Sequence, residues 1–314
     1  MKKFSILLLP IVVVIGFIVI GRYQKLLILP TDEEQVKQPL ISTQKSRDKT
    51  TRVNKPQRIV SLAPNITEIL FALGLDKEIV AVSSDSDYPN GVANKQKVGT
   101  FWQPNTEAVI ASKPDLVITL WFEQQNQVAE SLKRLDYPVL TLKIKKIEEL
   151  LTAIQQIGVA TGSEQRAERL AKEISTQLND LQSKFESVYK VKVLWVVQPE
   201  PLRVAGRNTF VNKLIELAGG ENAIGQTIQQ YPPISTEEIL ACDAEIIIQT
   251  AMGTAGTSEQ QKAAEKFWSR WKTLPAVVNN RIYIVPPDTV LRLGPRLCEG
   301  TELIANCLHP DENR

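Results

Sequence analysis

The feature that most constrains the fold is a short pattern that occurs twice in the chain. Residues 105–118 and residues 235–248 align without a gap, and each begins with a helix-capping residue followed by a Thr-Glu pair. In each copy a short helix leads through an acidic residue into an apolar strand of the kind found in buried parallel sheets. Many αβ units look alike, but the shared Thr-Glu pair and the shared spacing favour two related lobes.

Strands and helices alternate around the first copy. We expect strands at Arg58–Leu62 and Ile79–Val82, and a further one within the repeat itself. Between the first two strands, a helix is expected to start at an Asn65 cap, with Glu68 completing a capping box, and to stop at Gly74. This strand-helix-strand order implies a parallel sheet.

The second half of the chain opens in the same way, with a strand at Val191–Val197 and a helix at Phe210–Leu217 that stops at a Gly-Gly pair. Between the halves, Ser163–Tyr189 has apolar residues every three or four positions and no Gly or Pro, which predicts one long helix. A helix of about 25 residues is nearly 40 Å long, enough to join two lobes as a stiff strut; the less favoured alternative is one helix packed within a single domain. The predicted fold class is α/β, with two Rossmann-like lobes, each built on a central parallel sheet, joined by a single long backbone helix.

The chain is expected to divide into six consecutive parts. Residues 1–21 have a basic start and then an apolar run, which predicts a signal peptide or an N-terminal membrane anchor. No cysteine lies there, so lipid attachment is not indicated. Residues 22–57 are polar and aperiodic, which predicts a disordered linker. The other parts are an N-terminal α/β lobe over 58–162, the connecting long helix over 163–190, a C-terminal α/β lobe over 191–308 and a tail over 309–314.

Composition argues against several classes of protein. The chain has 37 basic and 35 acidic residues and no basic stripe, so we expect no nucleic-acid partner. The single histidine, His309, is expected to be solvated in the tail, which leaves Ser-His-Asp and Cys-His chemistry without a base. No dinucleotide, P-loop or nucleophile-elbow motif occurs, so we expect no catalytic residue, no metal site and no cofactor. Three cysteines, none in a CxxC pair, make a disulfide possible but not implied.

Aromatic and charged side chains gather where predicted strands end. Ligands of open parallel sheets bind outside the carboxyl ends of the strands, and aromatic faces offer a large stacking area to a flat ligand. A single Trp at a strand end is more often packed than exposed, so it is the coincidence of several that favours a cleft here. The candidate ligand-binding residues are Tyr88, Trp102, Trp121, Tyr231, Asp288 and Arg292.

Several segments together resemble a known family. They are Ser84–Pro89, Gly99–Gln103, Lys113–Val117 and Gly219–Asn222. From about residue 58 to residue 308 the chain is similar to the periplasmic binding proteins that serve importers of cobalamin, ferric siderophores and haem, and most of all to the vitamin B12-binding members. The resemblance implies two α/β lobes joined by one long helix.

The resemblance also implies roles for individual residues. Tyr88, Trp102 and Trp121 would contact a corrin ring, Tyr231 would replace a tryptophan, and Asp288 and Arg292 would face the ligand. The implied ligand is cobalamin, which is transported rather than kept as a cofactor. Glu107 and Glu237, one from each lobe, would dock onto arginines of an ABC transporter permease; otherwise they are favourable acids in the first turn of a helix.

Two departures from the family pattern put the ligand in doubt. Arg203 lies near a family aromatic position, and Ala218 replaces a disulfide cysteine. A ferric siderophore or another metal chelate is therefore an alternative ligand, because Arg203, Arg207 and Arg292 suit an anion. Less favoured alternatives are a membrane-tethered sensor or scaffold and an enzyme on the same fold. The expected location is the periplasm, either as a soluble protein after signal cleavage or tethered to the inner membrane by the N-terminal segment.

Overall fold

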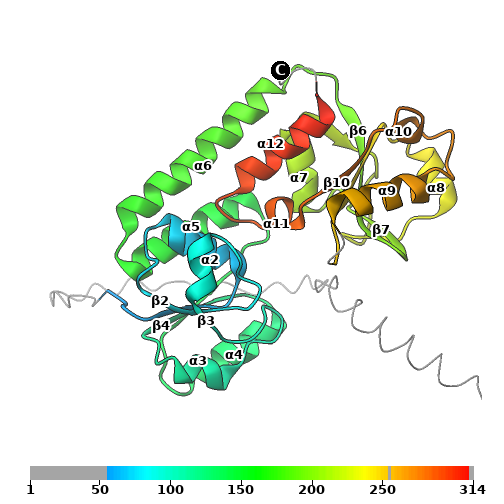
Figure 1. Cartoon of the computed structure of the whole chain (residues 1–314). Coiled ribbons are helices and arrows are strands. Elements are labelled where there is room, and N and C mark those ends of the chain that lie inside the picture. Colours follow the sequence, from blue (N-terminus) through cyan, green and yellow to red (C-terminus); the bar gives the residue numbers. More distant parts are fainter. Residues whose placement is uncertain (1–54, 254–255, 311–314) are drawn as a thin grey trace, which may run out of the picture. The chain divides into compact units, whose positions relative to one another are not determined.

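The computed structural model describes residues 55–253 and 256–310, which contain two five-stranded sheets (Figure 1). The predicted signal peptide or anchor over 1–21 and the linker up to residue 54 lie outside the described residues, as do positions 311–314. Within the described ranges, no helix combines the length and the apolar character needed to cross a membrane. The α/β class predicted from the sequence is confirmed.

The first sheet has the order β3-β2-β1-β4-β5, and all of its pairings are parallel. Its strands are β1 (Ile59–Ser61), β2 (Ile79–Val82), β3 (Gln96–Lys97), β4 (Leu116–Leu120) and β5 (Val139–Leu142). The helical segments of this half are α2 (Pro64–Ala72), η1 (Asn90–Asn94), α3 (Thr106–Ala111), α4 (Glu123–Lys133) and α5 (Ile147–Thr161). Because successive strands are parallel, their carboxyl ends share one edge of the sheet, where the candidate residues follow them.

The predicted start of α2 is wrong in detail. The helix begins at Pro64, with Ala63 as its N-cap, because the fixed φ of proline suits a first helical position. Asn65 lies within the first turn instead: its side-chain oxygen accepts from the Ile66 amide at 3.0 Å, and its side-chain amide donates to the Leu293 carbonyl at 3.0 Å. Glu68 forms no capping box either, and its carboxylate pairs with arginines of the second half.

The second sheet has the order β10-β9-β6-β7, and β8 also pairs with β6. Its strands are β6 (Val191–Pro199), β7 (Leu202–Val204), β8 (Gly220–Asn222), β9 (Ile246–Thr250) and β10 (Ile282–Val285). Only β7 is antiparallel to its neighbour among these described pairings. The helices of this half are α7 (Phe210–Leu217), α8 (Thr236–Ala241), α9 (Thr257–Trp268), α10 (Pro275–Val278), α11 (Pro287–Val290) and α12 (Leu297–Leu308).

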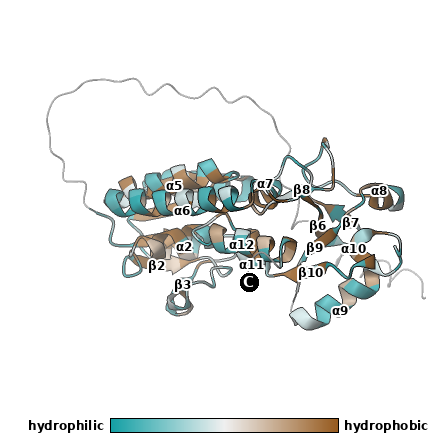
Figure 2. Ribbon diagram, turned by 90° about the horizontal axis from the view of Figure 1, so that it is seen from above, coloured by the Kyte–Doolittle hydropathy of each residue, from teal (hydrophilic) through white to brown (hydrophobic). Residues whose placement is uncertain are grey.

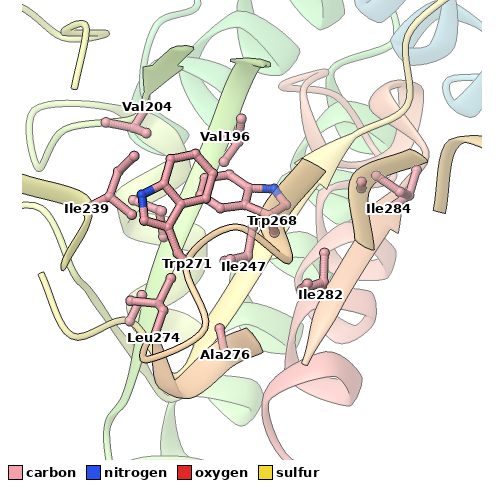
Figure 3. Packing of buried hydrophobic residues seen from close by; sticks show 13 residues of the cluster. Val196, Val204, Ile239, Ile247, Trp268, Trp271, Leu274, Ala276, Ile282 and Ile284 are labelled. Carbon is pink, nitrogen blue, oxygen red and sulfur yellow. The ribbon is translucent and has the colours of Figure 1, made fainter. Parts of the chain in front are cut away.

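Apolar side chains hold the second sheet to its helices. Strands β6, β9 and β10 are coloured as hydrophobic in Figure 2, as expected for strands buried on both faces. Trp268 and Trp271 lie over one face of the sheet, against residues such as Val196 and Ile247 (Figure 3). Trp268 is fully buried, and large rings of this kind dominate the energetics of a core.

The predicted long helix is α6, Glu164–Lys184, and it is shorter than the stretch 163–190 expected from the sequence. It follows α5 through Gly162, whose φ of 62° lies in the left-handed region. At 1.5 Å per residue its 21 residues span about 31 Å. It contacts α5 of the first half and α7 and α12 of the second, so it touches both halves (Figure 1).

The expectation that His309 is solvated is wrong. His309 is 8% exposed, and its ring stacks on Phe185 with 5.2 Å between centroids. Phe185 is the residue at which α6 ends, so the end of α12 covers the end of α6. Cys242, Cys298 and Cys307 are all free thiols.

The two copies of the sequence repeat adopt the same local structure. In the first, the Asn105 side chain accepts from the Ala108 amide at 2.9 Å, and in the second the Ser235 side chain accepts from the Glu238 amide at 3.2 Å. Each short helix is followed by a residue with positive φ, Lys113 at 49° and Asp243 at 50°. The aligned segments of the sequence are therefore structurally equivalent α3–β4 and α8–β9 units.

Candidate ligand-binding site

An aromatic cluster lies beyond the ends of β3 and β4. The Trp102 ring is 4.9 Å from that of Phe101 and 5.5 Å from that of Phe122, both in edge-to-face arrangement. The loop that carries Phe101 is held by Gln125, whose buried amide donates to the Phe101 carbonyl at 3.1 Å. The Phe101 amide in turn donates to the Asp85 carboxylate. Trp102 is therefore a partly exposed ring on a fixed loop.

A tight turn presents this loop, and it requires glycine. Gly99 has a φ of 94°, where other residues are strained. A Cβ at this position would lie 2.5 Å from the Gln103 carbonyl oxygen and 2.6 Å from the Asn105 amide nitrogen. The glycine thus allows the chain to fold back between β3 and the cap of α3 with Phe101 and Trp102 at its tip.

Two further candidate aromatics are exposed. Trp121 directly follows β4 and is 48% exposed, with the Lys145 ammonium 5.2 Å from its ring centroid. Tyr88 is 44% exposed, and the guanidinium of Arg296 lies 4.0 Å from its ring centroid. Large aromatic rings left exposed on one edge of a sheet are suited to bind a flat ligand.

The charged candidates form a cluster that joins the two halves of the molecule. Arg292 pairs with Asp87 at 2.5 Å, with Asp288 at 2.5 Å and with Glu68 at 3.5 Å. Arg296 binds both carboxylate oxygens of Glu68: its Nε donates to Oε2 at 2.9 Å, and its Nη2 donates at 2.6 Å to Oε1, the oxygen that Arg292 also reaches. We call these five residues the interlobe charge cluster. Glu68 and Asp87 belong to the first half of the chain, so the cluster connects segments more than 200 residues apart.

The pairing fixes the ionisation of the cluster. Burial acts to raise the pKa of Asp87, but the hydrogen bond from Arg292 and the charges of Arg292 and Arg296 outweigh it and leave that pKa below its usual value. Burial acts to lower the pKa of Arg292, and Asp87, Asp288 and Glu68 raise it overall. The hydrogen bond to Glu68 raises the pKa of Arg296. Asp87, Arg292 and Arg296 are therefore charged at neutral pH.

Tyr231 lies on the segment between β8 and α8. It is partly buried, and burial raises the pKa of its phenol to about 12, so the hydroxyl keeps its proton at neutral pH. Arg203 donates to the Tyr231 carbonyl at 3.0 Å. Arg207 pairs with Glu221 at 2.7 Å and also donates to the Ile224 carbonyl at 3.2 Å. These two arginines and Arg292, the three that the sequence suggested for an anion, are thus all engaged within the protein.

The candidate docking residues occupy equivalent positions. Glu107 and Glu237 are both exposed, each in the first turn of its helix, α3 and α8 respectively. Glu238, beside Glu237, is used differently: its carboxylate accepts from the Ser235 amide at 2.8 Å and completes a capping box. In each repeat unit a glutamate therefore extends into solvent from the start of the helix.

The structure brings most candidates together and adds partners that sequence reasoning missed. Arg292 donates to the Asp85 carbonyl, and the Asp85 carboxylate accepts from the amide of Phe101, the residue before Trp102. Arg296 lies over the Tyr88 ring, whereas the Tyr231 carbonyl accepts from Arg203. The missed partners are Glu68, Asp87, Arg296 and Gln125. Asp87 stood beside Tyr88 in the motif, and Arg296 stands four positions after Arg292, but no sequence signal connected either of them to Glu68.

Two surface hollows lie away from these residues. One lies along α4, lined by residues such as Glu123 and Arg134. The other, of about 460 Å³, lies between α6 and α12 and is lined by residues that include Leu181 and Asn306. Neither is lined by a candidate ligand-binding residue.

Two mainly parallel α/β sheets, a long helix that contacts both halves, and aromatic and charged residues beyond the strand ends define a two-lobed binding-protein fold. The sequence profile of the family described as "Periplasmic binding protein" matches residues 59–289. The chain belongs to this family, whose members bind ligands rather than convert them.

Two curated relatives and one solved structure illustrate the similarity. The chain is 32% identical over 281 residues to the uncharacterized ABC transporter substrate-binding lipoprotein YvrC of Bacillus subtilis, covering 87% of this chain and 86% of the relative. It is 29% identical over 262 residues to the vitamin B12-binding protein of Vibrio parahaemolyticus, covering 82% and 91%. A crystal structure of a possible iron-binding (periplasmic solute-binding) protein from Staphylococcus epidermidis has a TM-score of 0.72 and 28% identity, covering 81% and 99%.

Proposed function

We propose that this chain is the extracytoplasmic substrate-binding component of an ABC importer, and that it captures cobalamin in a cleft between its two lobes. One observation carries the proposal most directly: three partly or largely exposed aromatic rings, Tyr88, Trp102 and Trp121, stand at the strand ends of the first half beside a charge cluster supplied by both halves. A corrin is a large flat ring system bordered by amides. Aromatic faces and a few fixed polar groups suit it.

The state of the arginines favours cobalamin over an anionic ferric chelate. Arg203 and Arg207 donate to protein carbonyls, and Arg207 and Arg292 pair with carboxylates. An anion would have to displace these partners, and a buried or partly buried charge that loses its partner is costly. A ligand with no net charge meets no such penalty. The vitamin B12-binding relatives point in the same direction.

A ferric siderophore or another metal chelate is the second candidate. It is favoured by the likeness to the possible iron-binding protein of Staphylococcus epidermidis. Calorimetric titration of the purified full chain, with cyanocobalamin in one arm and an anionic ferric catecholate in the other, separates the two. Saturable one-to-one binding of cyanocobalamin alone supports the proposal. Binding of the ferric catecholate alone would replace it with the second candidate.

Delivery would use the equivalent glutamates. We expect Glu107 and Glu237, exposed at the starts of α3 and α8, to contact basic residues of the permease, one from each lobe. The lobes would close modestly on the ligand, because α6 contacts both halves and limits their relative motion.

The location we propose is the periplasm. The B. subtilis relative is named a lipoprotein, whereas the first 241 residues of this chain contain no cysteine to carry a lipid. The apolar run within residues 1–21 would therefore either tether the protein to the inner membrane or be removed as a signal peptide.

A further inference from the structure

Glu68 is a buried carboxylate in the middle of an apolar helix. It is 3% exposed, and its neighbours on α2 include Ile66, Ile69 and Leu70, all fully buried. A carboxylate in such surroundings is strongly destabilising unless cations and hydrogen bonds compensate it. The helix itself does not require a charge at this buried position. The partners of Glu68 therefore indicate the role of its carboxylate.

Those partners are the two arginines nearest to the candidate ligand residues. Arg296 binds Glu68 through two nitrogens, at 2.9 Å and 2.6 Å, and its guanidinium also lies 4.0 Å from the ring centroid of Tyr88. Arg292 reaches Glu68 at 3.5 Å while it pairs with Asp87 and Asp288. Two-pronged pairing of this kind fixes the orientation of a guanidinium. Glu68 therefore contacts both arginines, and the one that it binds through two nitrogens also lies against the Tyr88 ring.

The charges around the site are closely balanced. Within the interlobe charge cluster, three carboxylates face two guanidinium groups. Lys97 and Asp85 add one charge of each sign next to it: Lys97 donates to the Ser86 carbonyl at 2.8 Å, and Asp85 accepts from the Phe101 amide. Without Glu68, two carboxylates would face two guanidinium groups. Arg296 would then lose the carboxylate that it binds through two nitrogens.

We propose that Glu68 is a specificity-determining residue that neutralises Arg292 and Arg296 and thereby makes the site select an uncharged chelate over an anionic one. The inference rests on the proposed capture of a flat chelate at this site, and it adds the charge class of that ligand. Glu68 acts through the arginines, so it is a positioning residue and has no contact of its own to offer a ligand at the exposed aromatic faces.

The test compares two ligands that differ by one charge. Cyanocobalamin has no net charge, and hydrolysis of one of its side-chain amides gives a monocarboxylate of nearly the same shape. The wild-type full chain should bind cyanocobalamin more tightly than the monocarboxylate, and Glu68→Gln should shift that ratio toward the monocarboxylate by about 5-fold, since a partly desolvated unit charge acts more strongly than one in water. Glu168→Gln, which removes an exposed carboxylate from α6, is the matched control and should leave the ratio unchanged.

A second readout needs no ligand. The chain has five tryptophans: Trp121 is 48% exposed and Trp102 is partly exposed, while the remaining three are buried, namely Trp195, Trp268 and Trp271. Quenching of tryptophan fluorescence therefore reports mainly on the candidate site. At constant, low ionic strength, Glu68→Gln should raise quenching by iodide relative to neutral acrylamide by up to about 2-fold, because removing one negative charge makes the local potential more attractive to the anion.

The two readouts separate the possible failures. If the wild type binds neither cobalamin, the proposed ligand is wrong, and the iodide-to-acrylamide ratio still decides the role of Glu68. If Glu68→Gln weakens both cobalamins equally and leaves the quenching ratio unchanged, Glu68 only holds the halves together and the inference is rejected. Should circular dichroism show that Glu68→Gln is unfolded, Asp87→Asn removes a more exposed carboxylate of the same cluster. It should shift both ratios in the same direction, and unchanged ratios in that variant would also overturn the inference.

Discussion

The α3–β4 and α8–β9 units differ in sequence but share the same backbone contacts. In the first, the Asp115 amide donates to the Arg58 carbonyl at 3.0 Å, and the Asp115 carboxylate accepts from the Arg58 amide at 2.9 Å. In the second, Glu245 and Lys192 make the same reciprocal pair, with both distances 2.9 Å. In both halves, an acid at this position connects the start of one strand to the neighbouring strand. The two repeat units therefore share a contact that holds the sheet together.

The same two halves differ at the edge where a ligand would bind. The first half supplies exposed aromatic rings, such as Trp121, whereas the second supplies Asp288, Arg292 and Arg296. Shared residues thus serve the framework, and the candidate ligand-binding residues are among those that differ. Function therefore has to be inferred from the differences between the halves, because the similarities follow from the fold alone.

The docking proposal gives Glu107 and Glu237 equivalent roles in the two halves. Reversing their charges should have the largest effect of the proposed changes, a loss of uptake. Glu107→Lys combined with Glu237→Lys should leave cobalamin affinity unchanged and reduce uptake by cells more than about 10-fold, because like charges facing each other across an interface cost several kcal/mol. Each single reversal should reduce uptake less than the double reversal does, and the two single reversals should reduce it by similar amounts. Glu168→Lys on α6 is the control. Normal uptake by the double variant would contradict the docking assignment.

Removing the aromatic rings tests the opposite claim, that the halves differ in what they offer a ligand. Trp121→Ala should weaken cobalamin binding by about 2 kcal/mol, about 30-fold, because a ring that stacks on a ligand acts as a hot spot. Tyr189→Ala removes another aromatic, 69% exposed and two residues before β6, and should leave affinity unchanged. Isothermal titration calorimetry measures both variants. Equal losses in the two would indicate a general effect on the fold.

The matched acids of the framework allow a smaller, direct comparison of stability. Asp115→Asn should lower the free energy of unfolding by about 1–2 kcal/mol, since charge-assisted hydrogen bonds to two backbone amides are weakened. Glu245→Gln should cost less, because one of its partners is the exposed hydroxyl of Tyr189, which water can satisfy. Urea denaturation checks the order of the two. A larger loss for Glu245→Gln would contradict the view that the second backbone amide bound by Asp115 contributes more than the Tyr189 hydroxyl bound by Glu245.

The smallest expected effect concerns pH. The pKa of Asp87 in the folded protein is below its ordinary value of 3.8, so its charge contributes to stability above that value, and the contribution is lost as the pH falls toward the folded pKa. The difference in unfolding free energy between wild type and Asp87→Asn should therefore be constant from about pH 5 to pH 8 and shrink below about pH 4. Thermal unfolding at a series of pH values measures it. A difference that changes between pH 6 and pH 8 would contradict the assignment.

Local patterns in the sequence were enough to predict the framework. Apolar runs located β2 and β4 at the residues where the structure has them, and the polar residues Asn105 and Ser235 identified the starts of α3 and α8. These signals depend on residues within a few positions of one another, such as a cap and the amide three residues on. They can therefore be seen in a single sequence.

The contacts that assemble the site are non-local, and the sequence misled on them. Asn65 and Glu68 have the spacing of a capping box, yet Glu68 pairs with Arg296, 228 residues away. His309 stands in a polar tail, yet it is buried against Phe185 because α12 returns along α6. Packing between distant helices decides both cases, and no short-range pattern encodes it. The ligand-binding roles of Tyr88, Trp102 and the other candidates remain predictions.

A crystal structure of the full chain with cyanocobalamin tests the central claim most directly. The account predicts the corrin between the aromatic rings of Trp102 and Trp121 on one side and Asp288 and Arg292 on the other, with Glu68 still paired to Arg296. A corrin bound elsewhere, for example in the hollow between α6 and α12, would contradict it.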